Sequence, residues 1–413
     1  MTHEAEQHRA KVVRFLVAGG VTLGMLLSQD LWFSVERQLP RVALLTALNN
    51  LPGELDLLLA VMVLVGCVVF AGLPAYRNVG GIIALSAGLM LAALDQLRWQ
   101  PWCYQYWLTI LILLPLGSIK PNALRCMNLV RWISIATYLW SGLHKCNHGF
   151  AQFYGIWVKE DFLMQSPAAL RPLIESGYWI AGPLEILIGI LFLIPASRRI
   201  AVLLACTLHL AILLFLGPVF NGDNLVILPW NVVMIALAIV LFWNFKAGLG
   251  TPLPGKRETV LAWTVGLLVF LMPMLSIMRA WPLYLSFHLY SGQQQRMQLV
   301  LTPAGVAKLD TDHRNQLLPS PVSDKLQVID YLSWSLDTLS VPVVDESRVL
   351  LAISKKLAGK FSLTAGDGFF YHDFPNYLDR KAWRKYTPEE ILLLEKLPEL
   401  PSLKLSKHEG NRQ

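Results

Sequence analysis

The sequence predicts a mainly α-helical protein, a polytopic transmembrane bundle of about nine spans followed by a small extramembrane α+β domain. Of the 413 residues, 54% are hydrophobic and only 15% are charged, which is too apolar for a single water-soluble core. Apolar runs that approach the length needed to cross a bilayer, about 20 residues, occur between residues 12 and 279 and not in the last third. We therefore expect a transmembrane helical domain at 1–279 and an extramembrane domain at 280–413.

The apolar segments are taken in chain order. Those expected to cross the membrane lie at about 12–27, 56–75, 80–94, 104–117, 124–147, 178–195, 200–217, from 225 onward, and 259–278. The third segment contains Gly80, Gly81 and Gly88, which allow close contact with a neighbouring helix. The stretch 150–176 is too polar to span and is expected to lie along the membrane surface.

Basic residues set the expected orientation. With the N-terminus in the cytoplasm, eleven lysines and arginines of the connecting segments lie inside and six lie outside, as the positive-inside rule favours. Topology and lipid headgroup contact thus explain the net charge of +7, and no nucleic acid is expected as a partner. The polar N-terminus of mixed charge does not read as a cleavable signal. We expect a multi-pass protein of the inner (plasma) membrane whose C-terminal domain is periplasmic or extracellular.

The C-terminal part has ordinary composition and no catalytic motif. Leu283 to Tyr290 and Gln295 to Thr302 are predicted to form a hairpin across residues 291–294. A helix is expected at about 345–358 with Asp345 as its N-cap, and another at Thr387 to Leu397 with acidic residues in its first turn.

Several ionisable residues stand inside the apolar segments. Arg131 is expected to pair with a carboxylate or a carbonyl that faces the bundle. Glu185 is a second ionisable residue inside an apolar segment. His209 has two interpretations, a packed histidine bonded to a polar neighbour, or a ligand or proton-relay residue.

Lys145 ends the apolar segment that begins near residue 124. Desolvation at that place would favour the neutral amine and make it available as a base, whereas the alternative is a lysine that extends towards the headgroups. His144 and His148 flank it, but two histidines are a weak metal signal and no metal is expected. Cys103 and Cys146 at the outer helix ends are either isolated thiols or a pair in an oxidising periplasm.

The connector between residues 95 and 106 is rich in both aromatic and polar residues. Residence at the membrane interface explains Trp99, Trp102 and Tyr106 without any function. It does not explain Asp95 and Arg98, which are expected to order the connector. In the predicted orientation this connector, Lys145 and the polar stretch 221–231 all converge on the outer face.

A family resemblance is carried by ten residues, Tyr138-Leu139-Trp140-Ser141-Gly142-Leu143-His144-Lys145-Cys146-Asn147. They resemble the lysine motif of the vitamin K-dependent gamma-carboxylases and of the broader horizontally transferred transmembrane domain superfamily. The connector 95–106 and the stretch from His209 through Asn224 to Asn231 resemble two other blocks of that superfamily, in the same order. The likeness covers the membrane part, about two-thirds of the chain.

In the carboxylases, a lysine deprotonates vitamin K hydroquinone, which is then oxygenated to the base that removes a proton from glutamate. The resemblance implies that Lys145 takes that lysine's position, with His209 as the second catalytic residue. It also implies a quinol cofactor, vitamin K-like or ubiquinol-like. The residues expected around the quinol are Trp99, Trp102, Tyr106, Asn224 and Asn231, and those expected to position substrate are Asp95, Arg98 and His144. Trp102 stands where the carboxylases carry a histidine, and an indole cannot accept a proton.

Two hypotheses of different classes follow. The first is a carboxylase-like or quinol-dependent membrane enzyme, a lyase or oxidoreductase, whose partners are membrane lipid and a lipophilic small molecule. The second is a non-catalytic membrane scaffold whose outer domain binds a protein or peptide partner, with the polar residues serving helix packing alone.

Overall fold

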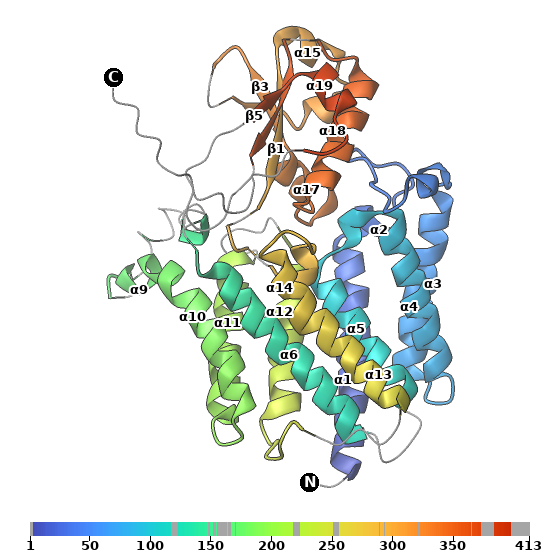
Figure 1. The fold of residues 1–413 in the computed structure, drawn as a ribbon, viewed down its shortest axis with the longest axis vertical. Coiled ribbons are helices and arrows are strands. Elements are labelled where there is room, and N and C mark those ends of the chain that lie inside the picture. Colours follow the sequence, from blue (N-terminus) through green and yellow to red (C-terminus); the bar gives the residue numbers. More distant parts are fainter. Residues whose placement is uncertain are drawn as a thin grey trace, which may run out of the picture.

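The computed structural model describes residues 3–116, 123–147, 149–151, 154, 163, 167–169, 171–217, 224–250, 256–288, 290–292, 294–320, 323–364, 366–372 and 384–397. Within these residues the protein is mainly helical, with one small antiparallel sheet. The long helices form a bundle, the sheet and its helices lie above one end of it, and α1 begins at the opposite end (Figure 1).

The bundle is built from the apolar segments of the sequence. Its long helices are α1 (His3–Leu27), α3 (Glu54–Gly72), α4 (Arg77–Leu94), α5 (Pro101–Leu116), α6 (Ala123–Lys145), α10 (Gly177–Leu193), α11 (Arg198–Leu216), α12 (Ile227–Phe242) and α13 (Lys256–Gly266), which continues through the π-helical turn η4 (Leu267–Leu271) into α14 (Met272–Ser276). Short elements between them are α2 (Gln29–Trp32), η1 (Thr46–Asn50), η2 (Gln96–Arg98) and α9 (Arg171–Glu175). Each of the expected apolar segments therefore contains a helix, whereas the surface helix expected at 150–176 falls mostly outside the described residues.

Among the described residues, four helices are long and apolar enough to cross a membrane, Glu4–Leu27, Glu54–Gly72, Arg77–Leu94 and Thr259–Ser276. Two shorter apolar helices are Gly177–Leu193 and Ile227–Phe242. Large apolar side chains cover the outer surfaces of this bundle, among them Leu58, Val68, Ile82, Leu203 and Leu210. Such a surface is unfavourable in water and is suited to lipid, so the helical part is that of a membrane protein.

Glycines set the distance between neighbouring helices. A Cβ on Gly80 of α4 would lie 2.5 Å from the Phe70 nitrogen of α3, and one on Gly88 would lie 2.6 Å from the Trp107 ring. The expected close helix contact at these glycines is confirmed. Gly142 of α6 meets α10 in the same way, because its Cβ would lie 2.6 Å from the Gly182 carbonyl oxygen. The backbones of α6 and α10 therefore touch within one turn of Lys145.

The π-helical turn between α13 and α14 has a cause in the sequence. Pro273 has no N–H to offer the carbonyl of Val269, four residues earlier, and its ring displaces that carbonyl. Two side chains from other helices bond the carbonyls at this turn: Trp140 Nε1 donates to Val269 at 3.0 Å and the Tyr104 hydroxyl donates to Leu268 at 2.9 Å. The break in α13–α14 thereby fixes this helix against α5 and α6.

Buried arginine–carboxylate pairs lie at both ends of the bundle. Near the start of α1, Arg131 donates to Glu6 at 2.9 Å and to the Leu241 carbonyl at 2.9 Å. This confirms the expected pairing of the in-membrane arginine. At the other end, Arg98 of η2 donates to Asp56 at 2.7 Å.

The C-terminal part forms a five-stranded antiparallel sheet in the order β2-β3-β1-β4-β5. The strands are β1 (Arg296–Leu301), β2 (Leu318–Pro319), β3 (Gln327–Asp330), β4 (Gly368–His372) and β5 (Arg384–Tyr386). Helices α15 (Pro303–Lys308), α16 (Thr311–Arg314), α17 (Tyr331–Leu339), α18 (Ser347–Phe361) and α19 (Pro388–Leu393) accompany it. Met297, Leu299 and Leu301 alternate along β1 and are buried on the side of α17 and α18.

The predicted hairpin of residues 283–302 is wrong. The second half is strand β1, but it pairs with β3 and β4, while the first half holds the 3-10 turn η5 (Tyr284–Ser286). Pro282 precedes that turn, and Phe287 and Tyr290 have positive φ angles of 57° and 49°, which a strand does not allow. The residues between the bundle and β1 are therefore a tightly folded connector.

The two predicted helices of the C-terminal part are present as α18 and α19, but α19 ends at Leu393 and not at the predicted Leu397. Thr387 caps α19 through a capping box with Glu390, in agreement with the acidic first turn. Asp345 does not cap α18, because Glu346 holds the N-cap position without a side-chain bond and Asp345 is buried.

The sheet-bearing part is bonded to the bundle. Gln100 donates to the Pro342 carbonyl at 3.2 Å, and Lys356 donates to the Arg41 carbonyl at 2.6 Å. The Arg348 guanidinium lies 4.8 Å from the Trp99 ring centroid. These contacts hold the sheet over the end of the bundle at which α6 terminates (Figure 1).

Candidate functional site

A cavity of about 340 Å³ opens between α6, α10, α11 and α12. Its walls are mostly aliphatic, with Leu184, Leu208, Ile212 and Met234 among them, and Tyr290 from the connector after α14 also lines it. This volume and the apolar lining with a few polar groups are typical of a site for a small lipophilic molecule.

Lys145 is the last residue of α6, and its side chain lines this cavity. Its Nζ donates to the Ser141 hydroxyl at 2.6 Å and lies 3.0 Å from both carboxylate oxygens of Glu185 on α10. The side chains of Lys145 and Glu185 are 10% and 6% exposed, so the pair is largely withdrawn from water. Lys145 therefore does not extend into solvent but belongs to a buried, bonded set on the cavity wall.

Three hydrogen-bonded side chains, Asn231, His209 and Tyr138, also line this cavity, and the donor and acceptor of each bond between them can be assigned. Asn231 Nδ2 donates to the Ile227 carbonyl at 2.8 Å, so its Oδ1 is the atom 2.7 Å from His209 Nδ1. An amide oxygen accepts, so in this assignment Nδ1 carries the proton and Nε2 of the neutral ring accepts. The Tyr138 hydroxyl, 2.7 Å from Nε2, is then the donor. Tyr138 keeps acceptor lone pairs for a ligand in the cavity.

Both polar sets meet on one face of α6. Tyr138, Ser141 and Lys145 are separated by three and four residues, which places them in one line along the helix. At a rise of 1.5 Å per residue, the seven residues from Tyr138 to Lys145 span about 10 Å. The site thus has a charged end at the helix terminus and a hydrogen-bonding end about two turns deeper.

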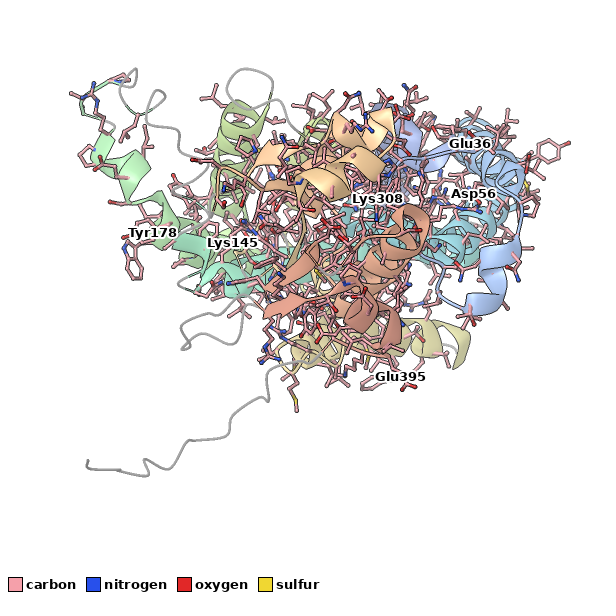
Figure 2. All side chains as sticks on the ribbon, turned by 90° about the horizontal axis from the view of Figure 1, so that it is seen from above. Glu36, Asp56, Lys145, Tyr178, Lys308 and Glu395 are labelled. Atoms are coloured by element: carbon pink, nitrogen blue, oxygen red, sulfur yellow. The ribbon has the colours of Figure 1, made fainter. Side chains whose placement is uncertain are left out.

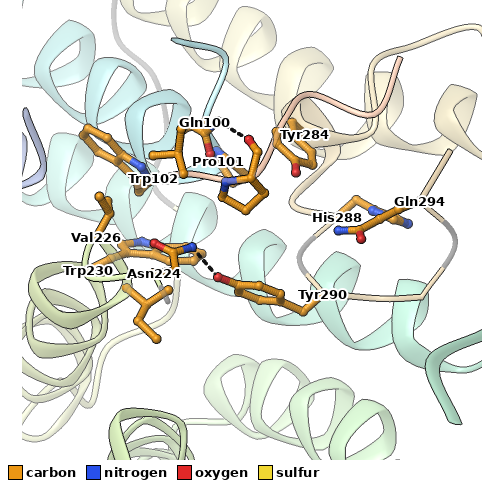
Figure 3. A pocket seen from close by; sticks show the side chains of 13 residues that line it. Gln100, Pro101, Trp102, Asn224, Val226, Trp230, Tyr284, His288, Tyr290 and Gln294 are labelled. Carbon is orange, nitrogen blue, oxygen red and sulfur yellow. Dashed lines mark hydrogen bonds between the residues drawn. The ribbon is translucent and has the colours of Figure 1, made fainter. Parts of the chain in front are cut away.

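The site residues predicted from the sequence do not all lie at the large cavity. Lys145, His209 and Asn231 line the large cavity. Asn224 reaches it indirectly, because its Nδ2 donates at 2.5 Å to the hydroxyl of Tyr290, which lines the cavity. Trp102 lines a neighbouring, smaller cavity together with Asn224 and Tyr290 (Figure 3).

The remaining predicted residues do not line the large cavity. Asp95 accepts from the Val42 nitrogen at 3.0 Å and Arg98 pairs with Asp56, so both order the connector before α5. Viewed from above, Asp56 lies on one side of the molecule and Lys145 on the other (Figure 2).

Trp99, Tyr106 and His144 also have packing neighbours outside the large cavity. Trp99 Nε1 donates to the Ala92 carbonyl at 2.8 Å. Tyr106 packs edge-on against Trp102, at 6.0 Å between ring centroids, and His144 contacts the ring of His288 at 4.9 Å. His148 lies outside the described residues.

The sequence also raised the questions of a metal site and of a thiol pair. Within the described ranges, no group of three histidine, cysteine, aspartate or glutamate residues is arranged to hold a metal ion. Cys103 is buried and Cys146 exposed, and both are free thiols, as in the first of the two interpretations.

Sequence reasoning assigned no role to Tyr138, Glu185 or Tyr290. The signal for Tyr138 was its seven-residue spacing from Lys145, and the signal for Glu185 was a carboxylate inside an apolar segment. Tyr290 had none, because only the folded connector brings it to the cavity. Burial raises the pKa of the Tyr290 phenol, which therefore stays protonated at neutral pH.

Comparison of the chain with protein-family models, with curated proteins and with solved structures found no match in any of the three.

Proposed function

We propose that this protein is a multi-pass membrane enzyme that binds a lipophilic molecule with an acidic hydroxyl, such as a quinol, and deprotonates it at Lys145. The proposal rests above all on one observation, a lysine–glutamate pair that is buried and forms the wall of an apolar cavity. Burying two charges costs several kcal/mol per ion in desolvation, and helix packing alone does not require it. The resemblance of residues 138–147 to the gamma-carboxylase lysine motif supports the same assignment.

The donor set suits a quinol. Aliphatic side chains such as Leu184 and Met234 would enclose its ring and tail. One hydroxyl would face Lys145 and Glu185, and a polar group at greater depth would meet the acceptor lone pairs of Tyr138. When bound, the quinol would supply the hydroxyl proton and the electrons of any later redox step.

Glu185 gives Lys145 its capacity as a base. The Lys145 ammonium can pass one proton to the Glu185 carboxylate, which lies 3.0 Å away, and this leaves a neutral amine and a neutral acid. The Lys145 amine then takes the hydroxyl proton of the ligand and becomes an ammonium beside the oxyanion that remains. Ser141, which accepts from Nζ, keeps the amine directed into the cavity.

Helix order supports the wider topology that we propose. In the part of the chain that the structure describes, nine long helical segments connect an N-terminal end on one side of the bundle with the sheet on the other (Figure 1). Together with the excess of basic residues on the N-terminal side, this favours nine spans in the plasma membrane, a cytoplasmic N-terminus and an outer-face site beneath the C-terminal domain.

The test uses the full-length protein in nanodiscs and a short-chain ubiquinol as the probe, under anaerobic conditions. Binding is measured by quenching of tryptophan fluorescence, and proton transfer by the absorbance change of the hydroquinone on ionisation. We expect wild type to bind and ionise the probe, and Lys145→Met to bind it without ionisation. Leu143→Met on α6 is the matched control, since this side chain is 44% exposed and does not line the cavity.

Equal ionisation by Lys145→Met and wild type would exclude the lysine mechanism. Failure of every folded variant to bind any quinol or other lipophilic probe would leave the polar residues as packing groups, as in the scaffold hypothesis.

A further inference from the structure

A second cavity, of about 20 Å³, lies between the bundle and the connector that precedes β1. It is lined by Trp102 at the start of α5, by Asn224, and by Tyr284, Tyr290 and Gln294 of the connector (Figure 3). A cavity volume of about 10–15 Å³ is the smallest that accommodates one water molecule. The space is therefore sufficient for one water and too small for an organic ligand.

Polar atoms of three side chains that line this cavity have no hydrogen-bond partner among the described residues, namely Trp102 Nε1, Asn224 Oδ1 and Gln294 Oε1. Trp102 is 4% exposed, so its N–H has no access to bulk solvent. Leaving a buried polar group unbonded costs about 1–3 kcal/mol. Figure 3 shows Trp102 and Asn224 on the same side of the cavity, with Gln294 on the opposite side.

We propose that the small cavity is a binding site for one ordered water that links Trp102 Nε1 to the side-chain amide of Asn224. An indole N–H can only donate and an amide oxygen can only accept, and a water molecule complements both. The pairing does not depend on the orientation of the amide. If the NH₂ group of Asn224 faced the cavity instead, the water would accept from both donors with its two lone pairs.

The water has a structural consequence for the large cavity. Asn224 donates to the hydroxyl of Tyr290, and Tyr290 lines both cavities. A water bonded to Asn224 Oδ1 fixes the orientation of the amide and therefore the position of Nδ2. Nδ2 in turn holds the phenol of Tyr290 in the wall between the two cavities. Trp102 thus positions Tyr290 through three hydrogen bonds, by way of the water and Asn224, although Trp102 does not line the large cavity itself.

Radiolytic hydroxyl-radical labelling of the full-length protein, read by mass spectrometry, tests the site without any assay of activity. Water bound beside a side chain yields radicals on X-ray exposure, so a buried tryptophan in contact with water is oxidised. Trp32 is the internal control, because it is 1% exposed, packs 6.1 Å from Trp102 between ring centroids, and already donates to Ser28 at 3.0 Å. We expect several-fold faster oxidation of Trp102 than of Trp32, and equal rates would overturn the proposal.

Two variants locate the water within the cavity. In Asn224→Leu, oxidation of Trp102 should fall to the rate of Trp32, whereas Gln294→Leu, the matched amide-to-leucine change on the opposite side, should preserve the fast rate. An equal fall in both variants would contradict the assigned position. If Asn224→Leu does not fold, the comparison of Trp102 with Trp32 in wild type still decides whether water is bound.

Discussion

Lys145 Nζ lies 3.0 Å from both carboxylate oxygens of Glu185, at the place where the backbones of α6 and α10 touch. The pair is formed by residues 40 positions apart, and close helix packing is what brings it to a hydrogen-bonding distance. Stability and the proposed chemistry therefore depend on the same contact.

Glu185→Leu is expected to destabilise the protein by about 3–5 kcal/mol, because it leaves the Lys145 ammonium buried without its counter-ion. The double variant Lys145→Met, Glu185→Leu should recover most of that loss, since no charge is left unpaired. Chemical unfolding in detergent micelles, analysed as a double-mutant cycle, measures the coupling. Additive effects of the two single changes would show that the pair does not interact.

Gly142→Ala is expected to lower the thermal unfolding temperature. The added Cβ would lie 2.6 Å from the Gly182 carbonyl oxygen and force α6 and α10 apart. Gly266→Ala in α13 is the control, because no heavy atom lies within 4 Å of the corresponding Cβ. This control should be neutral or stabilising by up to about 1 kcal/mol through helix propensity. Equal effects at both glycines would argue against close packing at Gly142.

Tyr138→Phe is expected to weaken binding of the ubiquinol probe while Lys145 still ionises the bound fraction. The change removes the acceptor that Tyr138 offers to the cavity and leaves His209 Nε2 without its donor. Loss of one hydrogen bond of this kind costs about 0.5–1.5 kcal/mol, which corresponds to roughly a twofold to twelvefold weaker affinity. Titration followed by fluorescence measures the affinity, and Tyr104→Phe, outside the cavity, is the control. Unchanged affinity would remove Tyr138 from the binding site.

Asp345→Asn is expected to stabilise the protein at neutral pH and to have little effect near pH 4. Burial and the neighbouring Glu346 carboxylate raise the pKa of Asp345 well above 3.8. Above pH 3.8 the unfolded chain has therefore released a proton that the native chain retains, so stability falls as pH rises towards the folded-state pKa. Asparagine has no proton to release, so the substitution removes a loss of stability of about 1.4 kcal/mol for each unit by which the pKa of Asp345 in the folded protein exceeds its value in the unfolded chain.

The pH dependence of the unfolding temperature checks this prediction. Wild type and Asp345→Asn should converge at low pH and diverge as pH rises. Parallel curves for the two proteins would show that the Asp345 carboxyl is not perturbed.

The long helices were accessible from the sequence because lipid-facing segments need continuous apolar runs of nearly fixed length. The pairing of Arg131 and the glycine contacts of α4 were predictable for a similar reason, since a buried charge needs a partner and a close helix contact needs small residues. The hairpin at 283–302 was not predictable. Alternating residues in 295–302 mark a strand but do not specify its partner, and β1 pairs with strands that come much later in the chain.

The sequence by itself determined that apolar helices dominate this chain, that Lys145 and His209 stand in apolar surroundings, and that a separate sheet-bearing part follows. Only the tertiary structure decided that Lys145 faces Glu185, that His209 faces Tyr138, and that Trp102 belongs to a different cavity. Helical periodicity fixes which residues share a face of one helix, but the rotation and distance of one helix relative to another result from packing over the whole bundle. Polar partners 40 or more residues apart are therefore set by the fold and not by any local pattern.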